Sequence, residues 1–535
     1  MRQFIVCGKV IPSPKVAAGP SEPEKYAAGE LVKYLRLAGI DAGEVSEEVS
    51  EEVSMETGAD VRISVDPSLP DDGFSVSPSD GGKLMIAGGN GRGAIYAVYR
   101  LLERFAGMRF FMPGLERYGE GDIVIGEALN FAPVFETRQS DWPCGNGDVD
   151  WCLKNMINVR PIPDSQGGHV RYGGFVHTMR NLNGTPWNEQ PCLTDPEVLK
   201  KTIASVREIL KKDPGIKIVS VSQNDNKNYC KCPRCAAVDA EEGSPAGTLL
   251  RFVNAVAADI AADYPDVVID TLAYQYTRRA PKITRPLPNV CIRLCSIECC
   301  FSHPLNDPTC AVNAAFVRDI IEWNRICDRT YIWDYVTNFH YYVPTFPNFG
   351  VMRENMRFFA EHGVRGMYPE GNYHSLRSGE FGELRCYLLA KLMGDPFMSE
   401  TEYRRHTDEF LEAYYGGGWR FVKVYLDLLV EESKGRHMSI WAPPFKVVDR
   451  GYYAEMEDTF DRLWDGAESL AGDRIDEVRR SRLQWRTIKL MLRPDAEKAG
   501  ELLEELSRRK IRWTEANELP VEPDLSASPE FWRRR

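Results

Sequence analysis

The chain has 535 residues, which is too long for one hydrophobic core, so we expect two or three domains. Its content of 43% hydrophobic and 27% charged residues is that of an ordinary globular protein. The net charge of −12 argues against nucleic acid as a partner, and no run of about 18 apolar residues is present that would span a membrane. The opening segment, MRQFIVCGKVIPSP, has no long apolar stretch, so we expect no export unless a leader has been removed.

Residues 1–130 are predicted to form an α+β domain. Phe4–Val6 is a short apolar strand, and residues 24–37 carry apolar side chains at helical spacing. The glycine-rich segment 88–93 lacks both the Walker lysine and the dinucleotide-binding spacing, so it predicts a tight turn before a helix. Further strands are expected at 61–65, 74–77 and 84–87, a helix at 94–105, and an acidic solvated loop at 44–54.

Residues 131–395 alternate between predicted strands and helices, which indicates a (β/α)8 TIM barrel. Residues 396–535 carry helix-period apolar positions and are predicted to form a helical C-terminal region. The strands are expected at 135–142, 174–179, 218–221, 267–276, 290–297, 330–336 and 365–368. The C-terminal helices are expected at 402–415, 419–434, 453–471 and 474–492.

The predicted carboxyl ends of these strands collect acids and aromatic residues. In parallel sheets and barrels this edge is where ligands bind, so we expect these side chains to converge on one site. The ring comprises Asp141, His177, Asn224, Asp225, Tyr274, Glu298, Trp333, Asp334, Tyr335 and Glu370.

Glycoside hydrolysis is the chemistry that best suits such a ring. It needs one group to protonate the leaving oxygen and another to stabilise or attack the sugar cation. A crowded set of carboxyl groups raises the pKa of the acid, and Trp333 and Tyr274 offer flat faces for sugar rings. No G-x-S-x-G or H-x-x-x-H motif is present, which argues against a serine or metal hydrolase, and no cofactor is expected.

A cysteine cluster, Cys230-x-Cys232-x2-Cys235, follows the strand at 218–221. Three thiols at this spacing are compatible with zinc, with Cys192, or one of Cys295, Cys299 and Cys300, as a fourth ligand. We favour free thiols, or a disulfide that pins the loop, and therefore predict no metal.

The segments SVSQNDNKNYCKCPRC, LAYQYT, LCSIECCFSHPL, IWDYVTNF and YPEG resemble glycoside hydrolase family 163, over about residues 20–440. The segment from Asp72 to Gly114 resembles the N-terminal domain of family 20. The resemblance implies a barrel with retaining endo-β-N-acetylglucosaminidase activity on N-glycans.

In the related substrate-assisted hexosaminidases of family 20, an Asp orients the 2-acetamido group of the substrate and the adjacent Glu is the general acid. Asn224 and Asp225 stand at the position of that pair, although Asn carries no charge and Asp is shorter than Glu. The resemblance implies that Asp225 is an essential carboxylate and that Glu298 is its acid partner, with Glu370 in reserve. It also implies that substrate is bound by Asn224, His177, Tyr274, Trp333, Asp334 and Tyr335.

Two other functions fit the sequence. The N-terminal domain also resembles that of α-glucuronidases, and Arg293 or Arg365 would face the carboxylate of a uronic acid. Alternatively, the protein binds glycans without cleaving them, an interpretation that the uncharged Asn224 supports.

Overall fold

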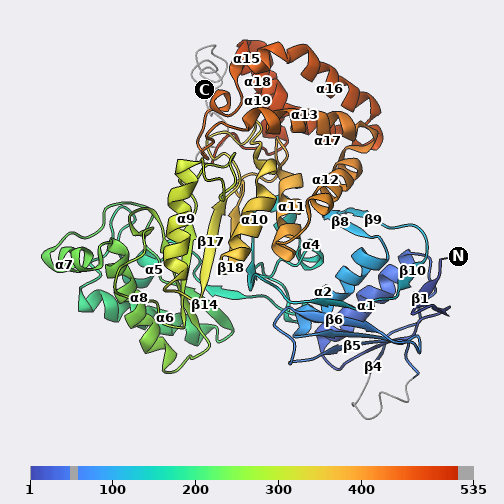
Figure 1. Ribbon diagram of the computed structural model, residues 1–535, viewed down its shortest axis with the longest axis horizontal. Helices are drawn as coiled ribbons and strands as arrows, with labels where there is room; N and C mark the ends of the chain where they lie inside the picture. Colours follow the sequence, from blue (N-terminus) through green and yellow to red (C-terminus); the bar gives the residue numbers. More distant parts are fainter. Residues whose placement is uncertain (1, 48–57, 516–535) are drawn as a thin grey trace.

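The computed structural model describes residues 2–47 and 58–515 (Figure 1). The N-terminal region pairs two helices with a six-stranded mixed sheet in the order β11-β6-β7-β5-β3-β4. A small sheet, β10-β1-β2, and a hairpin, β8-β9, flank it. Its elements are β1 (Phe4–Val6), β2 (Lys9–Ile11), β3 (Val16–Ala18), α1 (Glu22–Leu37), β4 (Ser46–Glu47), β5 (Val61–Val65), β6 (Phe74–Pro78), β7 (Leu84–Gly88), α2 (Gly91–Phe105), β8 (Arg109–Met112), β9 (Leu115–Arg117), β10 (Ile123–Ile125) and β11 (Leu129–Phe131).

The glycine-rich segment forms the tight start of α2, as predicted. The Asn90 side chain accepts a hydrogen bond from the backbone N–H of Gly93 at 2.8 Å and so caps the helix. A Cβ atom at Gly88 would lie 2.0 Å from the backbone nitrogen of Ala94, so close packing of strand against helix requires glycine there. The predicted loop at 44–54 contains the short strand β4, and its residues 48–54 lie outside the described part of the chain.

The central sheet has seven parallel strands in the order β13-β14-β15-β16-β17-β18-β12. The first strand along the chain pairs with the last, as in a barrel, but β12 and β13 do not pair with each other. Asn158 bridges the seam between them: its N–H donates to the Arg138 carbonyl at 3.1 Å, and its carbonyl accepts from Val170 at 2.8 Å. The strands are β12 (Thr137–Arg138), β13 (Arg171–Gly173), β14 (Ile216–Ser220), β15 (Val268–Ala273), β16 (Val290–Cys295), β17 (Thr330–Tyr335) and β18 (Val364–Glu370).

The sheet corrects three predictions. Within the described residues it is a curled sheet of seven strands with an open seam, not a closed eight-stranded barrel. The strand expected at 135–142 is reduced to Thr137–Arg138, because α3 begins at Pro143. The strand expected at 174–179 is wrong, since β13 ends at Gly173 and the backbone turns at Gly174, which has a φ of +77°.

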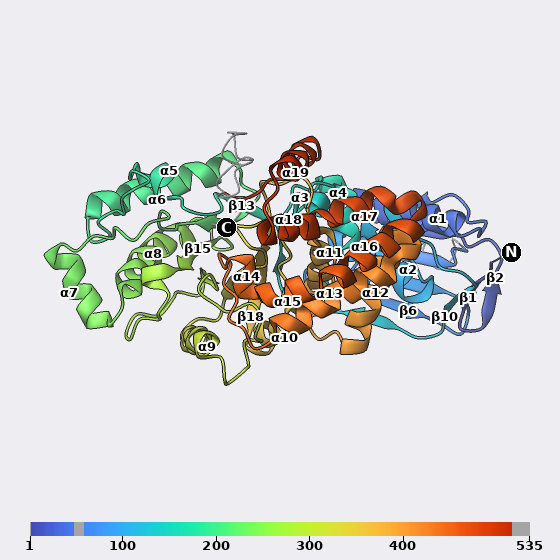
Figure 2. The same cartoon turned by 90° about the horizontal axis from the view of Figure 1, so that it is seen from above.

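Helices cover the sheet and continue into the C-terminal region. One large hydrophobic core extends from the sheet through its helices to the C-terminal helices, which lie above the junction with the N-terminal region (Figures 1 and 2). The predicted helices 453–471 and 474–492 are each broken in two. The helices are α3 (Pro143–Asn146), α4 (Val149–Lys154), α5 (Met179–Asn183), α6 (Pro196–Lys212), α7 (Pro233–Glu242), α8 (Pro245–Ala261), α9 (Ala311–Asn324), α10 (Met352–Glu361), α11 (Gly382–Gly394), α12 (Glu400–Tyr415), α13 (Trp419–Ser433), α14 (Pro444–Val447), α15 (Arg450–Glu455), α16 (Glu457–Leu470), α17 (Ile475–Ser481), α18 (Leu483–Leu492) and α19 (Ala496–Arg508). Over residues 2–47 and 58–515, no helix has the length and apolar character needed to cross a membrane.

A buried acid ties the N-terminal region to the central sheet. Asp72 accepts hydrogen bonds from Arg92 at 2.8 Å, from Arg138 of β12 at 2.7 Å and from Asn158 at 2.8 Å. Burial raises the pKa of Asp72, but the two guanidinium groups and Asn158 outweigh it and lower the pKa to about 2. The ionised carboxylate therefore holds the two regions together.

Replacing Asp72 by Asn is expected to reduce the free energy of unfolding by about 3–5 kcal/mol at pH 7, because Arg138 loses its buried partner. The pKa of Asp72 is lower in the folded state, so this stabilisation is present above about pH 4 and is lost as the pH falls toward 2. Urea unfolding of the variant and of the neighbouring Asp71→Ala control would measure the difference. Equal, small effects of both substitutions would contradict this role.

Candidate active site

A cavity of about 670 Å³ opens at the carboxyl ends of the parallel strands. Four successive strands line it with residues spaced two apart, because alternate side chains of a strand point to the same face. These inward-facing pairs are Leu272 and Tyr274, Cys295 and Ile297, Trp333 and Tyr335, and Tyr368 and Glu370.

Four carboxyl groups also line this cavity: Asp141, Asp225, Glu370 and Glu515. Asp225 follows β14 and Glu370 ends β18, and three strands separate β14 from β18 in the sheet. Asp225 and Glu370 therefore reach the same cavity from strands that are not neighbours in the sheet.

Glu370 is the buried acid of the site. It is 8% exposed, and its Oε2 accepts a hydrogen bond from the Trp333 indole at 2.7 Å. Burial, followed by the negative charge of Asp141, raises its pKa well above the ordinary value. Glu370 therefore holds a proton under conditions in which an ordinary glutamate has lost it.

Asp141 is the neighbour that keeps Glu370 protonated. Burial raises the pKa of Asp141 to about 6, against the lowering effect of hydrogen bonds from the backbone of Gly371 and the Tyr368 hydroxyl. The hydroxyl lies 2.8 Å from Asp141 Oδ2. Because these donors stabilise the anion, Asp141 ionises first, and its charge opposes ionisation of Glu370.

Asp225 is a solvent-exposed carboxyl group that lines the same cavity as Glu370. The Tyr274 hydroxyl donates to its Oδ1 at 3.0 Å, and the Gln275 amide approaches the same oxygen at 3.4 Å. The cavity thus combines a buried, protonated carboxyl group with an exposed carboxylate held by a tyrosine.

Asn224, predicted to contact the sugar, is not among the residues that line this cavity. The residue is fully buried, and its side-chain amide donates to the backbone carbonyls of Pro186 and Glu189, each at 3.0 Å. Asn224 is buried whereas the adjacent Asp225 is exposed and lines the cavity. Asn224 instead fixes the loop that carries Asp225.

Glu298, predicted as the acid, is also absent from the residues that line the cavity. Its side chain is 44% exposed and pairs at 2.9 Å with Arg278, which also contacts Asp319 at 2.7 Å. Strand β16 ends at Cys295, and Glu298 follows in a turn that directs it away from the inward face. An ion pair at the surface is the environment of a structural residue.

Asp334 lies between two cavity residues but does not line the cavity itself. It accepts a hydrogen bond from the Ser296 hydroxyl at 2.6 Å, behind the sheet face that carries Trp333 and Tyr335. Asp334 is therefore not among the predicted residues that the structure brings together at the cavity. Burial raises its pKa to about 6.

An Asp334→Asn variant is expected to be more stable than the wild type at pH 8, by up to about 3 kcal/mol, and nearly equal to it at pH 4. The raised pKa means that the folded state prefers the protonated acid, so wild-type stability falls as the pH rises from about 4 through 6. Urea unfolding at the two pH values measures the change. If the variant and the wild type differed in free energy of unfolding by the same amount at pH 4 and pH 8, ionisation of buried Asp334 would not be the cause.

The remaining predicted site residues lie around the cavity. His177 adopts a φ of +52°, and its Nδ1 lies 2.7 Å from the Gln223 carbonyl oxygen, which orients the ring. The structure therefore brings together seven of the predicted residues: Asp141, His177, Asp225, Tyr274, Trp333, Tyr335 and Glu370.

Several lining residues were not predicted. Tyr368 could have been predicted, because it lies two positions before Glu370 on the same strand and therefore points to the same face of the sheet. Trp441, Tyr373 and Glu515 come from loops after the sheet, and nothing in their local sequence indicates that they cover it. The unpredicted polar and aromatic residues are Phe175, Gln275, Phe339, Tyr368, Tyr373, Trp441 and Glu515.

Both arginines that were expected to recognise a uronic acid are engaged elsewhere. Arg293 is buried in an ion pair with Asp270, and its guanidinium lies 4.5 Å from the Phe175 ring centroid. Arg365 lies near the amino end of β18, 3.8 Å from Glu136. No lysine or arginine is among the described residues that line the cavity.

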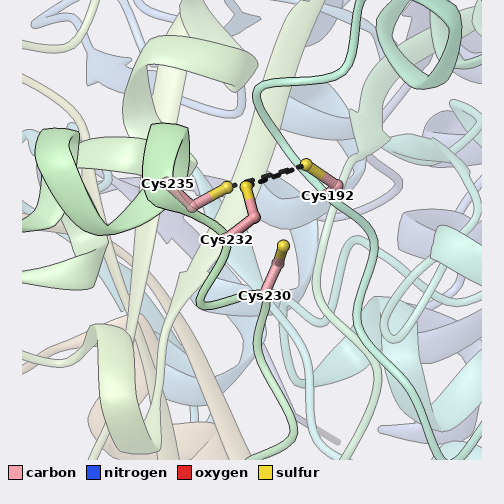
Figure 3. A group of neighbouring side chains, drawn as sticks. All are labelled: Cys192, Cys230, Cys232 and Cys235. Atoms are coloured by element: carbon pink, nitrogen blue, oxygen red, sulfur yellow. Dashed lines mark hydrogen bonds between the residues drawn. The ribbon is translucent and has the colours of Figure 1, made fainter.

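The cysteine cluster gains a fourth member from a separate loop. Cys192 lies beside Cys230, Cys232 and Cys235 (Figure 3), and each of the fourteen cysteines is a free thiol, so the expected disulfide is not formed. Of the other cysteines considered as fourth ligands, Cys295 lines the cavity and Cys300 belongs to a second group with His303.

Comparison with known proteins finds one matching family and solved structures with a similar fold. Residues 177–427 match a family described as "Domain of unknown function (DUF4838)". No curated protein sequence matches the chain. One similar solved structure is a glycoside hydrolase family 138 enzyme that targets pectin rhamnogalacturonan II, with a TM-score of 0.51, 11% identity and 97% of each chain covered.

A second similar structure is a family 115 4-O-methyl-α-glucuronidase with specificity for decorated arabinogalactans. Its TM-score is 0.57 at 12% identity, and the match covers 94% of this chain and 74% of that one. At these identities the likeness shows a shared fold, and both structures with this fold are glycoside hydrolases.

Proposed function

We propose that the protein is a glycoside hydrolase in which Glu370 is the general acid and Asp225 is the carboxylate that stabilises the reacting sugar. The observation that carries this proposal is the pairing of a buried carboxyl group of raised pKa with an exposed carboxylate across one cavity. Glycosidases pair a carboxyl group whose surroundings raise its pKa, which acts as the acid, with a second carboxyl group in a more polar environment, which acts on the sugar.

The substrate class that fits best is a glycan with an N-acetylhexosamine, such as an N-glycan. The absence of cationic side chains among the described lining residues favours an uncharged sugar. Phe175, Trp333 and Tyr335 offer an apolar wall to an acetamido methyl group, and Asp225 accepts hydrogen bonds at its edge. At the rim, Trp441 and Tyr373 are each 39% exposed, which suits a glycan longer than one sugar.

The reaction we infer is substrate-assisted and retains the anomeric configuration. Glu370 gives its proton to the glycosidic oxygen while the acetamido oxygen attacks the anomeric carbon, and the aglycone leaves as an alcohol. Asp225 accepts the acetamido N–H and stabilises the positive charge that develops on the ring so formed. Glu370, now a carboxylate, takes a proton from the water that opens this ring, which restores both groups.

Neither alternative function has equal support. A glycosidase specific for uronic acids would need a cation near the sugar carboxylate, whereas Arg293 is buried in an ion pair with Asp270 behind the Phe175 ring and Arg365 pairs with Glu136. The argument for a binding protein without activity depended on Asn224, which fastens a loop instead of facing the cavity.

A substrate panel tests the proposal. Aryl β-glycosides of N-acetylglucosamine and glucose and an aryl α-glucuronide would be incubated with the full chain beside a glycoprotein that carries N-glycans. We expect turnover of the N-acetylglucosaminide or release of the N-glycan. Turnover of the glucuronide alone would favour the uronate alternative, and glycan binding without any cleavage would favour the binding protein.

A further inference from the structure

Four thiols gather outside the cavity, from segments that are far apart in the sequence (Figure 3). Cys192 precedes α6, Cys230 follows β14, Cys232 is the N-cap of α7, and Cys235 lies in the first turn of that helix. Their sulfur atoms all lie within 4.8 Å of one another. The Cys192 sulfur lies 3.8 Å from that of Cys232 and 3.7 Å from that of Cys235.

These separations fit a tetrahedral metal site better than a disulfide. Sulfur ligands at about 2.3 Å from a tetrahedral zinc ion lie about 3.8 Å from one another. A disulfide bond would require about 2.05 Å. The thiols are thus spaced for four bonds to one central ion rather than for a bond between any two of them.

We propose that Cys192, Cys230, Cys232 and Cys235 bind one Zn²⁺ ion as a structural site. Four protein thiolates complete the tetrahedron and leave no position for water or substrate, so the ion has no part in the chemistry of the cavity. The site goes beyond the proposed function, because it does not depend on what the cavity binds.

The proposed ion would fasten the loop that carries Asp225. The loops before α6 and after β14 are already linked by hydrogen bonds, since the Gln190 amide donates to the carbonyls of Asn224 at 2.6 Å and Asn226 at 2.9 Å. Asn228 donates to Asn188 at 2.8 Å. The thiol group closes the outer end of this pair of loops, and Asp225 lies at the inner end. Zinc here would position Asp225 without touching substrate.

A second group of potential metal ligands, separate from the four cysteines, is also arranged to bind a zinc ion. Cys300, His303, Cys310 and His437 have ligand atoms within 4.8 Å of one another. The Cys300 sulfur lies 3.1 Å from His303 Nδ1, and the Cys310 sulfur lies 3.8 Å from His437 Nδ1. Two Cys and two His residues form a common zinc ligand set.

This second site would join the central sheet to the C-terminal helices. Cys300 follows β16 and Cys310 caps α9, whereas His437 lies between α13 and α14. Ile440 and Trp441, which line the cavity, follow His437 closely. Each site therefore anchors one part of the cavity rim.

The metal content of the full chain, purified without chelators, tests both sites by elemental analysis. We expect about two zinc ions per chain in the wild type and one in a Cys230→Ser/Cys232→Ser variant. His437→Gln with Cys310→Ser is expected to remove the other ion. Cys7→Ser, a matched control in the N-terminal region, should keep both. A wild-type protein without metal, or cysteine variants that keep the full content, would overturn the proposal.

A second measurement uses the wild-type chain, so its result does not depend on whether the variants fold. Wild-type protein stripped of metal would be titrated with Co²⁺, which replaces zinc and absorbs strongly when thiolates bind it. We expect thiolate-to-cobalt charge-transfer bands that saturate at about two ions per chain. The absence of these bands would overturn the proposal. Neither readout involves glycoside cleavage, so failure here is distinct from failure of the proposed function.

Discussion

Replacement of Glu370 by Gln is expected to lower kcat on a natural glycan by about 10²–10⁴-fold, the loss that follows removal of a general acid. Gln keeps the shape of Glu and can still meet the Trp333 indole, but it has no proton to give to the leaving oxygen. The wild-type rate should also fall on the alkaline side as Glu370 ionises, at a pH above that of an ordinary glutamate, because its pKa is raised. The variant should lose this dependence.

Glu298→Gln is the matched control for this experiment. It makes the same chemical change at an exposed ion pair with Arg278, outside the cavity, and is expected to keep wild-type activity. If Glu298→Gln lost activity and Glu370→Gln kept it, the two assignments would have to be exchanged. Circular dichroism and the Tm of each variant would establish that the fold is intact.

Replacement of Asp225 by Asn is expected to cost about 10²–10⁴-fold in kcat, comparable to the loss at Glu370. Asn can still accept a hydrogen bond from Tyr274, so the geometry survives while the negative charge disappears. The fall should appear in kcat rather than KM, because the charge is needed only when the sugar becomes cationic. Initial rates over a range of substrate concentrations separate the two constants.

Asp213→Asn serves as the control for the charge change. Asp213 precedes the same strand, β14, at its opposite end, and pairs with Arg171 at 3.3 Å, so its loss should leave turnover intact. An Asp225→Asn variant that keeps turnover within about threefold of the wild type would remove Asp225 from the mechanism.

The order of strands and helices could be predicted over most of the chain because apolar periodicity is local. The same periodicity already separates the inward residues from the outward ones: Trp333 and Tyr335 share one face of their strand, and Asp334 must take the other. Applied along β18, this alternation also groups Tyr368 with Glu370. The ends of the strands could therefore be predicted from the sequence. To choose the residues that line the cavity, one must also know which face of its strand each acidic side chain occupies.

Residues in loops could not be placed in this way. Asn224 and Glu298 lie beyond the ends of their strands, where the two-residue alternation no longer applies and long-range contacts decide direction. The open seam at Asn158 also has no local signature, because it depends on contacts with Arg138 and Val170. Cys192 was one of several candidate partners for the cysteine cluster, and only the folded chain distinguishes it from Cys295.

The leaving-group dependence of Glu370→Gln tests the central claim most directly. The 2,4-dinitrophenolate group leaves its glycoside without being protonated, whereas the leaving oxygen of an unactivated glycan needs a proton from the enzyme. We predict that Glu370→Gln releases 2,4-dinitrophenolate from the activated N-acetyl-β-glucosaminide in a single turnover at close to the wild-type rate but loses cleavage of the glycan almost entirely. Equal losses on both substrates, or no loss on either, would contradict the assignment of Glu370 as the acid of a glycoside hydrolase.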